Sequence, residues 1–233
     1  MTGRDDPALP AVWREPFALA WEALRAGSRP VGAVLVDARG HVVARGRNRS
    51  QEAAATAPPG QLAGAAIAHA EVNVLGQLTA ARRYEDHRLF TTLEPCLLCS
   101  GALLHAHVGT VFYAAPDPLW QGIERIPSVS GAIAERWTRR VGPVQGPLAV
   151  FGALLMDLWS LRHDAPPSGG ERAFDHGAQA SARRCAEIPG FTEAETVAVA
   201  YRLALPHLSP YAGDAGGSDD RSIDMSNDMS NDR

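Results

Sequence analysis

The sequence contains no lysine, no long apolar run and only three cysteines among its 233 residues. No apolar stretch reaches the roughly 18 to 20 residues that a membrane-spanning helix requires, so no membrane partner is expected. Residues 1–10 lack the apolar segment of a secretory signal, which favours a cytoplasmic protein. Three cysteines are too few for a disulfide framework, and in a reducing compartment a close cysteine pair indicates metal binding or catalysis.

Positive charge is not in excess either. All 22 basic residues are arginines spread along the chain, which we interpret as a compositional bias, and the formal net charge is −4. Residues 212–233 contain six aspartates and two arginines, so this segment alone carries −4 and residues 1–211 are neutral. A domain that binds nucleic acid usually carries a basic excess, so nucleic acid is not the expected partner.

Apolar periodicity and turn residues predict helices alternating with strands. We expect strands at 31–36, 41–45, 89–93, 110–115 and 141–144, and helices at 15–26, 65–82, 95–107, 131–138, 148–161 and 193–205. This order predicts an α/β fold, a three-layer α/β/α sandwich with a central mixed five-stranded sheet.

Composition divides the chain into three parts. Residues 1–163 hold all the elements of the predicted sheet and form the expected main domain. Residues 164–210 begin with a stretch rich in proline, glycine and charge, which predicts a linker followed by one accessory helix. Residues 211–233 are rich in glycine, serine and aspartate, which predicts a disordered acidic tail.

Two short motifs carry the candidate chemistry. The first is His69-Ala70-Glu71 at the start of the second predicted helix, and the second is Pro95-Cys96-Leu97-Leu98-Cys99 at a strand-to-helix junction. Taken separately, a buried histidine is usually structural, and a Cys-x-x-Cys pair can be a redox pair like that of thioredoxin. Neither of these interpretations requires a glutamate two residues after the histidine or a proline before the first cysteine. Together the motifs match the His-x-Glu and Pro-Cys-x-x-Cys signature of zinc deaminases.

The residue types fit a catalytic zinc site. One imidazole and two thiolates, from His69, Cys96 and Cys99, fill three of the four tetrahedral positions that zinc prefers and leave the fourth for water. Thiolates are stabilised at a helix N-terminus. A carboxylate beside that water, Glu71, can take a proton and later return it to a leaving group.

Further motifs resemble one protein family. Pro30-Val31-Gly32-Ala33-Val34, Gly46-Arg47-Asn48 and Thr92-Leu93-Glu94-Pro95-Cys96 are similar to the pattern of the cytidine/deoxycytidylate deaminase superfamily. The resemblance is to its branch of tRNA adenosine, guanine and small nucleoside deaminases, over roughly residues 17–161. It implies a zinc-dependent deaminase domain in residues 1–163.

The resemblance also implies roles for individual residues. His69, Cys96 and Cys99 would bind Zn²⁺, and Glu71 would shuttle protons. Asn48 would hold the base or ribose, and the backbone of Ala70 would help to position the ring.

The expected substrate is a free nucleobase, nucleoside or nucleotide. The segment 116–120, built around Trp120, stands where tRNA-acting relatives have a small loop with lysine and glycine. Trp120 could pack in the core or stack on a free base at the mouth of the pocket. The alternatives are a tRNA adenosine deaminase and an inactive binding protein that keeps the fold. Members of this branch pair or tetramerise, so we expect a homodimer, with the apolar face of the helix at 99–104 as a contact.

Overall fold

The computed structural model describes residues 9–163 and 182–208. The predicted linker at 164–177 and the predicted acidic tail lie outside these residues. The helices and strands are α1 (Ala11–Arg25), β1 (Gly32–Val36), β2 (Val42–Arg47), η1 (Ala54–Thr56), α2 (Ala70–Leu75), β3 (Arg88–Leu93), α3 (Leu97–Ala106), β4 (Thr110–Ala115), η2 (Pro118–Trp120), η3 (Ile123–Val129), α4 (Gly131–Ala134), β5 (Arg139–Val141), α5 (Pro147–Arg162), α7 (Val197–Ala204) and η5 (Leu205–His207).

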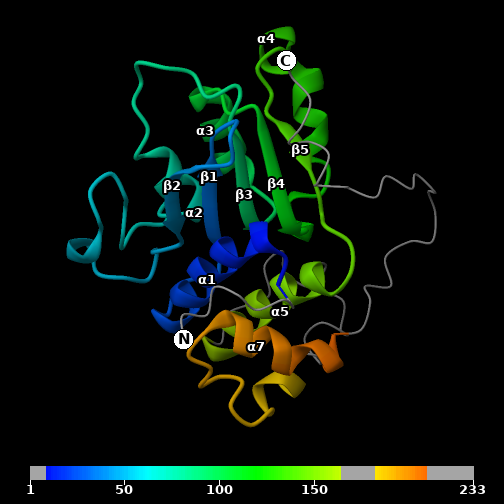
Figure 1. Ribbon diagram of the computed structural model, residues 1–233. Helices are drawn as coiled ribbons and strands as arrows, with labels where there is room; N and C mark the ends of the chain where they lie inside the picture. Colours follow the sequence, from blue (N-terminus) through cyan, green and yellow to red (C-terminus); the bar gives the residue numbers. More distant parts are fainter. Residues whose placement is uncertain (1–8, 164–181, 209–233) are drawn as a thin grey trace.

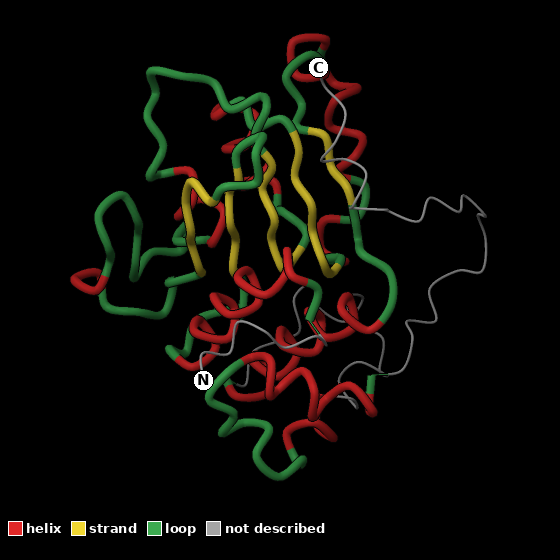
Figure 2. Tube along the Cα trace, viewed as in Figure 1, coloured by secondary structure: helices red, strands yellow, loops and turns green. Residues whose placement is uncertain are grey.

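The strands form one mixed sheet of five, in the order β2-β1-β3-β4-β5. β1 is antiparallel to both β2 and β3, whereas β3, β4 and β5 run parallel. Figure 1 shows the strands side by side in this order, and Figure 2 shows the same sheet between helices. The predicted mixed five-stranded sheet is confirmed.

Alternating side chains of the strands divide the core between the two faces of the sheet. Val34 and Phe90 point to one face and join the apolar side chains of α1 and α5. Ala33 and Leu89 point to the other face and join those of α2 and α3. The three layers follow from this period of two in the strands, and they confirm the predicted sandwich.

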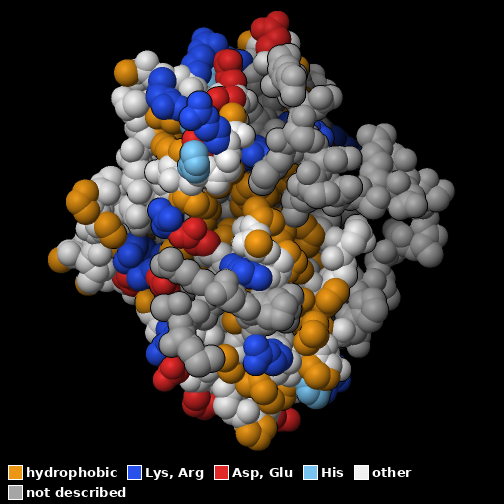
Figure 3. All heavy atoms as spheres, viewed as in Figure 1, with side chains coloured by type: hydrophobic (Ala, Val, Ile, Leu, Met, Phe, Trp, Pro, Cys, Tyr) orange, Lys and Arg blue, Asp and Glu red, His pale blue; other side chains and the backbone are white. Residues whose placement is uncertain are grey.

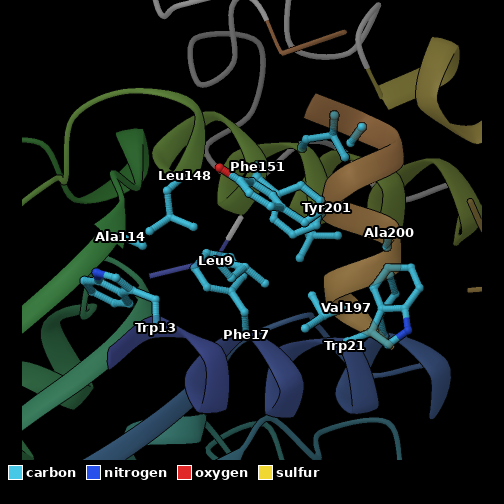
Figure 4. Packing of buried hydrophobic residues seen from close by; sticks show 14 of the residues in the cluster. Leu9, Trp13, Phe17, Trp21, Ala114, Leu148, Phe151, Val197, Ala200 and Tyr201 are labelled. Carbon is cyan, nitrogen blue, oxygen red and sulfur yellow. The ribbon is translucent and has the colours of Figure 1, made fainter. Parts of the chain in front are cut away.

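A further layer covers α1 and α5 on the side away from the sheet (Figure 1). The ring centroids of Phe151 and Tyr201 lie 4.9 Å apart, and those of Trp21 and Phe191 lie 6.0 Å apart. The Trp21 indole N–H donates to the Ala194 carbonyl at 3.0 Å. Figure 4 shows this cluster between α1, α5 and α7, so residues 182–208 share the core of the main domain.

The second predicted helix, 65–82, is wrong in length, because α2 covers only Ala70–Leu75. Gly76 lies against the loop before α2, since a Cβ on Gly76 would meet the Gly60 carbonyl oxygen at 2.5 Å. The fully buried Asn73 side chain also binds this loop, through both the N–H and the C=O of Leu62. The loop therefore occupies the space that a longer helix would need.

Other boundaries shift in ways that have local causes. The fifth strand is Arg139–Val141 instead of 141–144, and Pro143 behind it has no N–H to give to a strand ladder. The first helix begins at Ala11, so Pro16 lies inside it and not in its first turn. The helix predicted at 131–138 is Gly131–Ala134, and that predicted at 193–205 is Val197–Ala204. In the described ranges, no helix is long and apolar enough to cross a membrane.

Candidate active site

One edge of the sheet collects the ends of four strands. Gly32, at the start of β1, pairs with Arg47 at the end of β2, and Leu93 at the end of β3 pairs with Ala115 at the end of β4. The Gly32 N–H donates to the Thr92 hydroxyl at 3.2 Å, which joins the two pairs. Segments that enter or leave the sheet here therefore meet in space.

The two sequence motifs meet at this edge. His69 and Cys96 are the N-cap residues of α2 and α3, and Cys99 lies in the first turn of α3. The His69 Nδ1 atom lies 3.5 Å from the Cys96 sulfur and 3.4 Å from the Cys99 sulfur. The two sulfurs are 3.5 Å apart. Two helix starts thus bring the three predicted ligand atoms together.

These distances fit a zinc ion. Zn–S bonds of about 2.3 Å and Zn–N bonds of about 2.0 Å place tetrahedral ligands about 3.5 to 3.8 Å apart. His69, Cys96 and Cys99 are the group in the described part of the chain whose ligand atoms lie close enough to share an ion. One nitrogen and two sulfurs form a donor set that zinc favours, and the set leaves one tetrahedral position open.

Glu71 is buried beside the cysteines, with 3% of its surface exposed. Its Oε1 accepts a hydrogen bond from the Thr91 hydroxyl of β3 at 2.7 Å. Its Oε2 lies 3.3 Å from the Cys99 sulfur. Both carboxylate oxygens are therefore fixed, and one of them faces the ligand set.

The ligand set favours negative charge on Cys96. Hydrogen bonding to Cys99 and to His69 lowers the pKa of Cys96 to about 4. The hydrogen bond between the sulfurs, with burial, raises the pKa of Cys99 well above its usual value. Burial likewise raises the pKa of Glu71. Zinc held by both sulfurs would displace the proton of Cys99.

Comparison with known proteins agrees with this geometry. Residues 11–115 match the cytidine and deoxycytidylate deaminase zinc-binding region. A tRNA-specific adenosine deaminase of Streptococcus pyogenes serotype M1 is 30% identical over 146 residues, which are 61% of this chain and 78% of that protein. The chain belongs to the cytidine and deoxycytidylate deaminase family. It therefore has the family's zinc site, at His69, Cys96 and Cys99.

Two other known proteins are similar to this chain, and the matches cover different shares of their lengths. A tRNA(Ile)-lysidine synthase of Deinococcus radiodurans is 36% identical over 135 residues, which are 57% of this deaminase but only 21% of that protein. The solved structure of a guanine deaminase from Nitrosomonas europaea is 20% identical with a TM-score of 0.50, and the match covers 66% of this chain and 85% of that one. At this identity the second match shows the fold alone.

The predicted substrate residues lie near the same edge of the deaminase. Asn48 follows β2 and is 3% exposed, and its Oδ1 accepts from the N–H and the hydroxyl of Ser50 at 3.0 and 2.8 Å. Ala70, fully buried, is the first residue of α2. Trp120 ends η2, and its backbone N–H donates to the Asp117 carbonyl at 2.9 Å. The roles of all three in binding remain predictions.

The sequence interpretation missed a buried arginine behind the cysteine turn. Arg140 of β5, 3% exposed, donates to Glu94 Oε1 at 2.8 Å and to the Ser100 hydroxyl at 2.9 Å. It also donates to the Pro95 carbonyl at 3.3 Å and to Glu124 Oε1 of η3 at 2.7 Å. Four acceptors around one guanidinium fix the turn that carries Cys96. The role could not be predicted from the sequence, because two arginines at the start of a strand, Arg139 and Arg140, match no known motif.

Asp117 and Thr91 were missed as well. Asp117 follows β4 with 7% of its surface exposed, and its N–H donates to Glu94 Oε2 at 3.1 Å. Burial raises the pKa of Asp117 to about 6. Thr91, fully buried, holds Glu71 in place. A threonine pair within a strand and a single aspartate in a loop look ordinary in a sequence, because only the fold brings them to the site.

Proposed function

We propose that this zinc deaminase acts on a free nucleobase, nucleoside or nucleotide and releases ammonia. The observation that supports it most is the ligand set of His69, Cys96 and Cys99 with Glu71 buried beside it and held by Thr91. A binding protein without catalysis would have no use for a buried carboxylate that is oriented on both oxygens.

The chain's own groups supply binding and proton transfer. Zinc held by the three ligands would lower the pKa of water and so provide a nucleophile at neutral pH. Glu71 takes the proton of the attacking water and delivers it to the departing amino group. The ring carbon gains a bond to oxygen and loses its bond to nitrogen, so one water is consumed and one ammonia leaves. Thr91 holds the Glu71 carboxylate at the position that both transfers need.

Polar contacts at the sheet edge would hold the ring. The described residues offer no hydrogen-bond acceptor to the side-chain amide N–H₂ group of Asn48, because both hydrogen bonds from Ser50 go to the amide oxygen. It can therefore donate to a base or a ribose. The backbone of Ala70 lies next to His69. We propose that Trp120, at the end of η2, stacks on the base.

Charge favours a small substrate over a folded RNA. Residues 1–211 carry no net charge, and RNA affinity depends on neutralising phosphates with basic side chains. Arginine and acidic side chains lie interspersed on the face in Figure 3. The Streptococcus pyogenes relative is named for action on tRNA, so an RNA substrate is the second candidate that the experiment below includes.

We further propose a homodimer in the cytoplasm. Leu97 and Leu98 on α3 are 49% and 42% exposed, and Leu119 is 54% exposed. Apolar side chains in such positions commonly meet a second subunit. For the division of the chain, we propose a deaminase domain in residues 1–163 and, in residues 164–210, an accessory segment whose residues 182–208 pack into the core of that domain.

The test is an ammonia-release assay on a panel of cytosine, adenine and guanine bases, nucleosides and monophosphates, with an anticodon stem-loop RNA as a further substrate. We expect at least one free compound to be deaminated. A chelator should abolish turnover, and added zinc should restore it. Efficient deamination of the RNA that falls steeply with salt, with no free compound accepted, would contradict the proposal.

A further inference from the structure

An arginine that no sequence motif singled out lies on the sheet edge that carries the site. Arg29 is exposed and precedes β1, on the sheet edge where β2, β3 and β4 end. The carbonyl of Val31, two residues after Arg29, accepts a hydrogen bond from the Asn48 backbone N–H at 2.9 Å. On the other side, the Ser28 hydroxyl accepts from the Gln51 N–H at 3.1 Å. The segment that carries Arg29 is therefore joined to the segment that carries the predicted base contact.

An aromatic ring holds the Arg29 side chain. The guanidinium lies 4.7 Å from the ring centroid of Trp159, near the end of α5. The Trp159 ring is fixed, because its N–H donates to the Gly27 carbonyl at 2.8 Å. The His163 ring stacks with it at a centroid distance of 4.5 Å. A guanidinium stacked in this way keeps its N–H donors free at its edges.

Hydrogen bonds join the Arg29 segment to the catalytic residues. Three residues after Arg29, the Gly32 N–H donates to the hydroxyl of Thr92 at 3.2 Å. Thr92 follows Thr91, whose hydroxyl holds Glu71.

Arg29 also differs from the arginines in β2 and just after it. Arg45 pairs with Glu15, and both Arg47 and Arg49 pair with Glu52. In the described ranges, Arg29 forms no ion pair with a carboxylate. Its charge is available to an anion from outside the protein.

We propose that Arg29, held on Trp159, binds the phosphate of a nucleoside monophosphate whose base lies at Asn48 and the zinc ligands. This inference rests on the proposed function and names the substrate class within it. The planar guanidinium offers paired N–H donors that match two phosphate oxygens. A nucleoside monophosphate carries its anionic group on the sugar, which must point outward once the base is buried. Arg29 is exposed and lies on the same edge of the sheet.

The test compares a nucleoside with its 5′-monophosphate as substrates of the full chain. We expect wild-type kcat/KM to favour the monophosphate, and Arg29→Gln to lower it by about 10- to 100-fold for the monophosphate alone, the range for a hydrogen bond to a charged group. Arg29→Lys should restore part of the loss. Arg39→Gln, at the β1–β2 turn on the opposite edge, makes the same charge change and should alter neither substrate.

Binding without turnover gives a second measurement. Calorimetric titration of the monophosphate into Glu71→Gln and into Glu71→Gln/Arg29→Gln should show weaker binding by a similar factor in the double variant. Equal kcat/KM for nucleoside and monophosphate, or equal losses for both in Arg29→Gln, would overturn the phosphate subsite and leave the proposed function intact. Turnover of the RNA alone would overturn both.

Discussion

Single residues decide what the site can do, and Glu71 is the clearest case. Its carboxylate is removed from water, and each of its oxygens has one neighbour, the Thr91 hydroxyl and the Cys99 sulfur. A side chain that is already held in place loses little conformational entropy when it transfers a proton. The role of Glu71 depends on its ability to take up and release a proton. Glu71→Gln keeps the shape of the side chain but removes this ability.

We therefore expect Glu71→Gln to fold and to retain zinc, but to lose at least about 10²- to 10⁴-fold in kcat, the usual contribution of a general acid–base group. Elemental analysis and a kcat measurement on the same preparation check this. Thr91→Val, which removes only the hydroxyl that holds Glu71, should give a smaller loss. Nearly unchanged turnover in Glu71→Gln would show that another group moves the protons.

A second buried carboxyl predicts how stability depends on pH. Asp157 of α5 is 1% exposed, and neither of its oxygens has a hydrogen-bond partner in the described part of the chain. Burial raises the pKa of Asp157 to about 7. Between about pH 4 and pH 7 the folded state keeps the proton that the unfolded state has lost, so this group lowers stability as the pH rises through that window. Above pH 7 the cost reaches about 4 kcal/mol.

Asp157→Asn removes the charge and keeps the size of the side chain. We expect the midpoint of thermal unfolding of the variant, relative to wild type, to rise between pH 5 and pH 8. Melting curves across this range test the expectation. A difference between the two proteins that stays constant with pH would mean that Asp157 does not titrate in this window.

At the scale of elements, the turn between β3 and α3 depends on a strand that lies two positions away in the sheet. Arg140 reaches from β5 past β4 to Glu94, Pro95 and Ser100. Glu94 in turn accepts from the Asp117 N–H, so one guanidinium supports both the cysteine turn and the loop after β4.

Arg140→Met should weaken zinc binding by about 10- to 100-fold, as is usual when a group that supports metal ligands is lost. Chelator competition measures this affinity, and the spectrum of the cobalt-substituted protein reports the ligand geometry. Arg136→Met is a matched control, because Arg136 is exposed and its side chain donates to the carbonyl of Ala132, away from the cysteine turn. Equal zinc affinity in both variants would rule out this role for Arg140.

Elements with a strong apolar period could be predicted from the sequence, whereas those shaped by distant contacts could not. β4 was predicted to the residue, and α3 and α5 to within two residues at each end. α2 was predicted far too long because the Asn73 contacts to Leu62 lie between segments whose proximity no local pattern records. The ligands were predictable for the opposite reason, since their spacing is local and chemically specific.

Over the whole molecule, residues 182–208 complete the core of the main domain. They bury apolar side chains of α1 and α5 that would otherwise face water, including Trp21 and Phe151. The composition of the segment suggested only an appended helix, because its aromatic partners Trp21 and Phe151 lie far earlier in the sequence.

Tyr201→Ala should therefore destabilise the entire domain by about 3 to 5 kcal/mol, the usual cost of removing a buried aromatic ring. Tyr201 is 3% exposed and meets Phe151 edge-on. Chemical denaturation, followed by both tryptophan fluorescence and far-ultraviolet circular dichroism, should show one shifted transition. Val199→Ala, at a 41% exposed position on the same helix, is the control. Separate transitions for the two probes would mean that α7 unfolds by itself.

The place of this segment in the chain also affects how the protein is made. A ribosome has synthesised all five strands and all three zinc ligands before residues 182–208 exist. During that interval the segment that covers the outer sides of α1 and α5 is missing, and the nascent chain presents Trp21 and Phe151 to solvent. The unfinished protein thus carries a transient hydrophobic surface that chaperones would bind, and slow translation between residues 163 and 182 would lengthen its exposure.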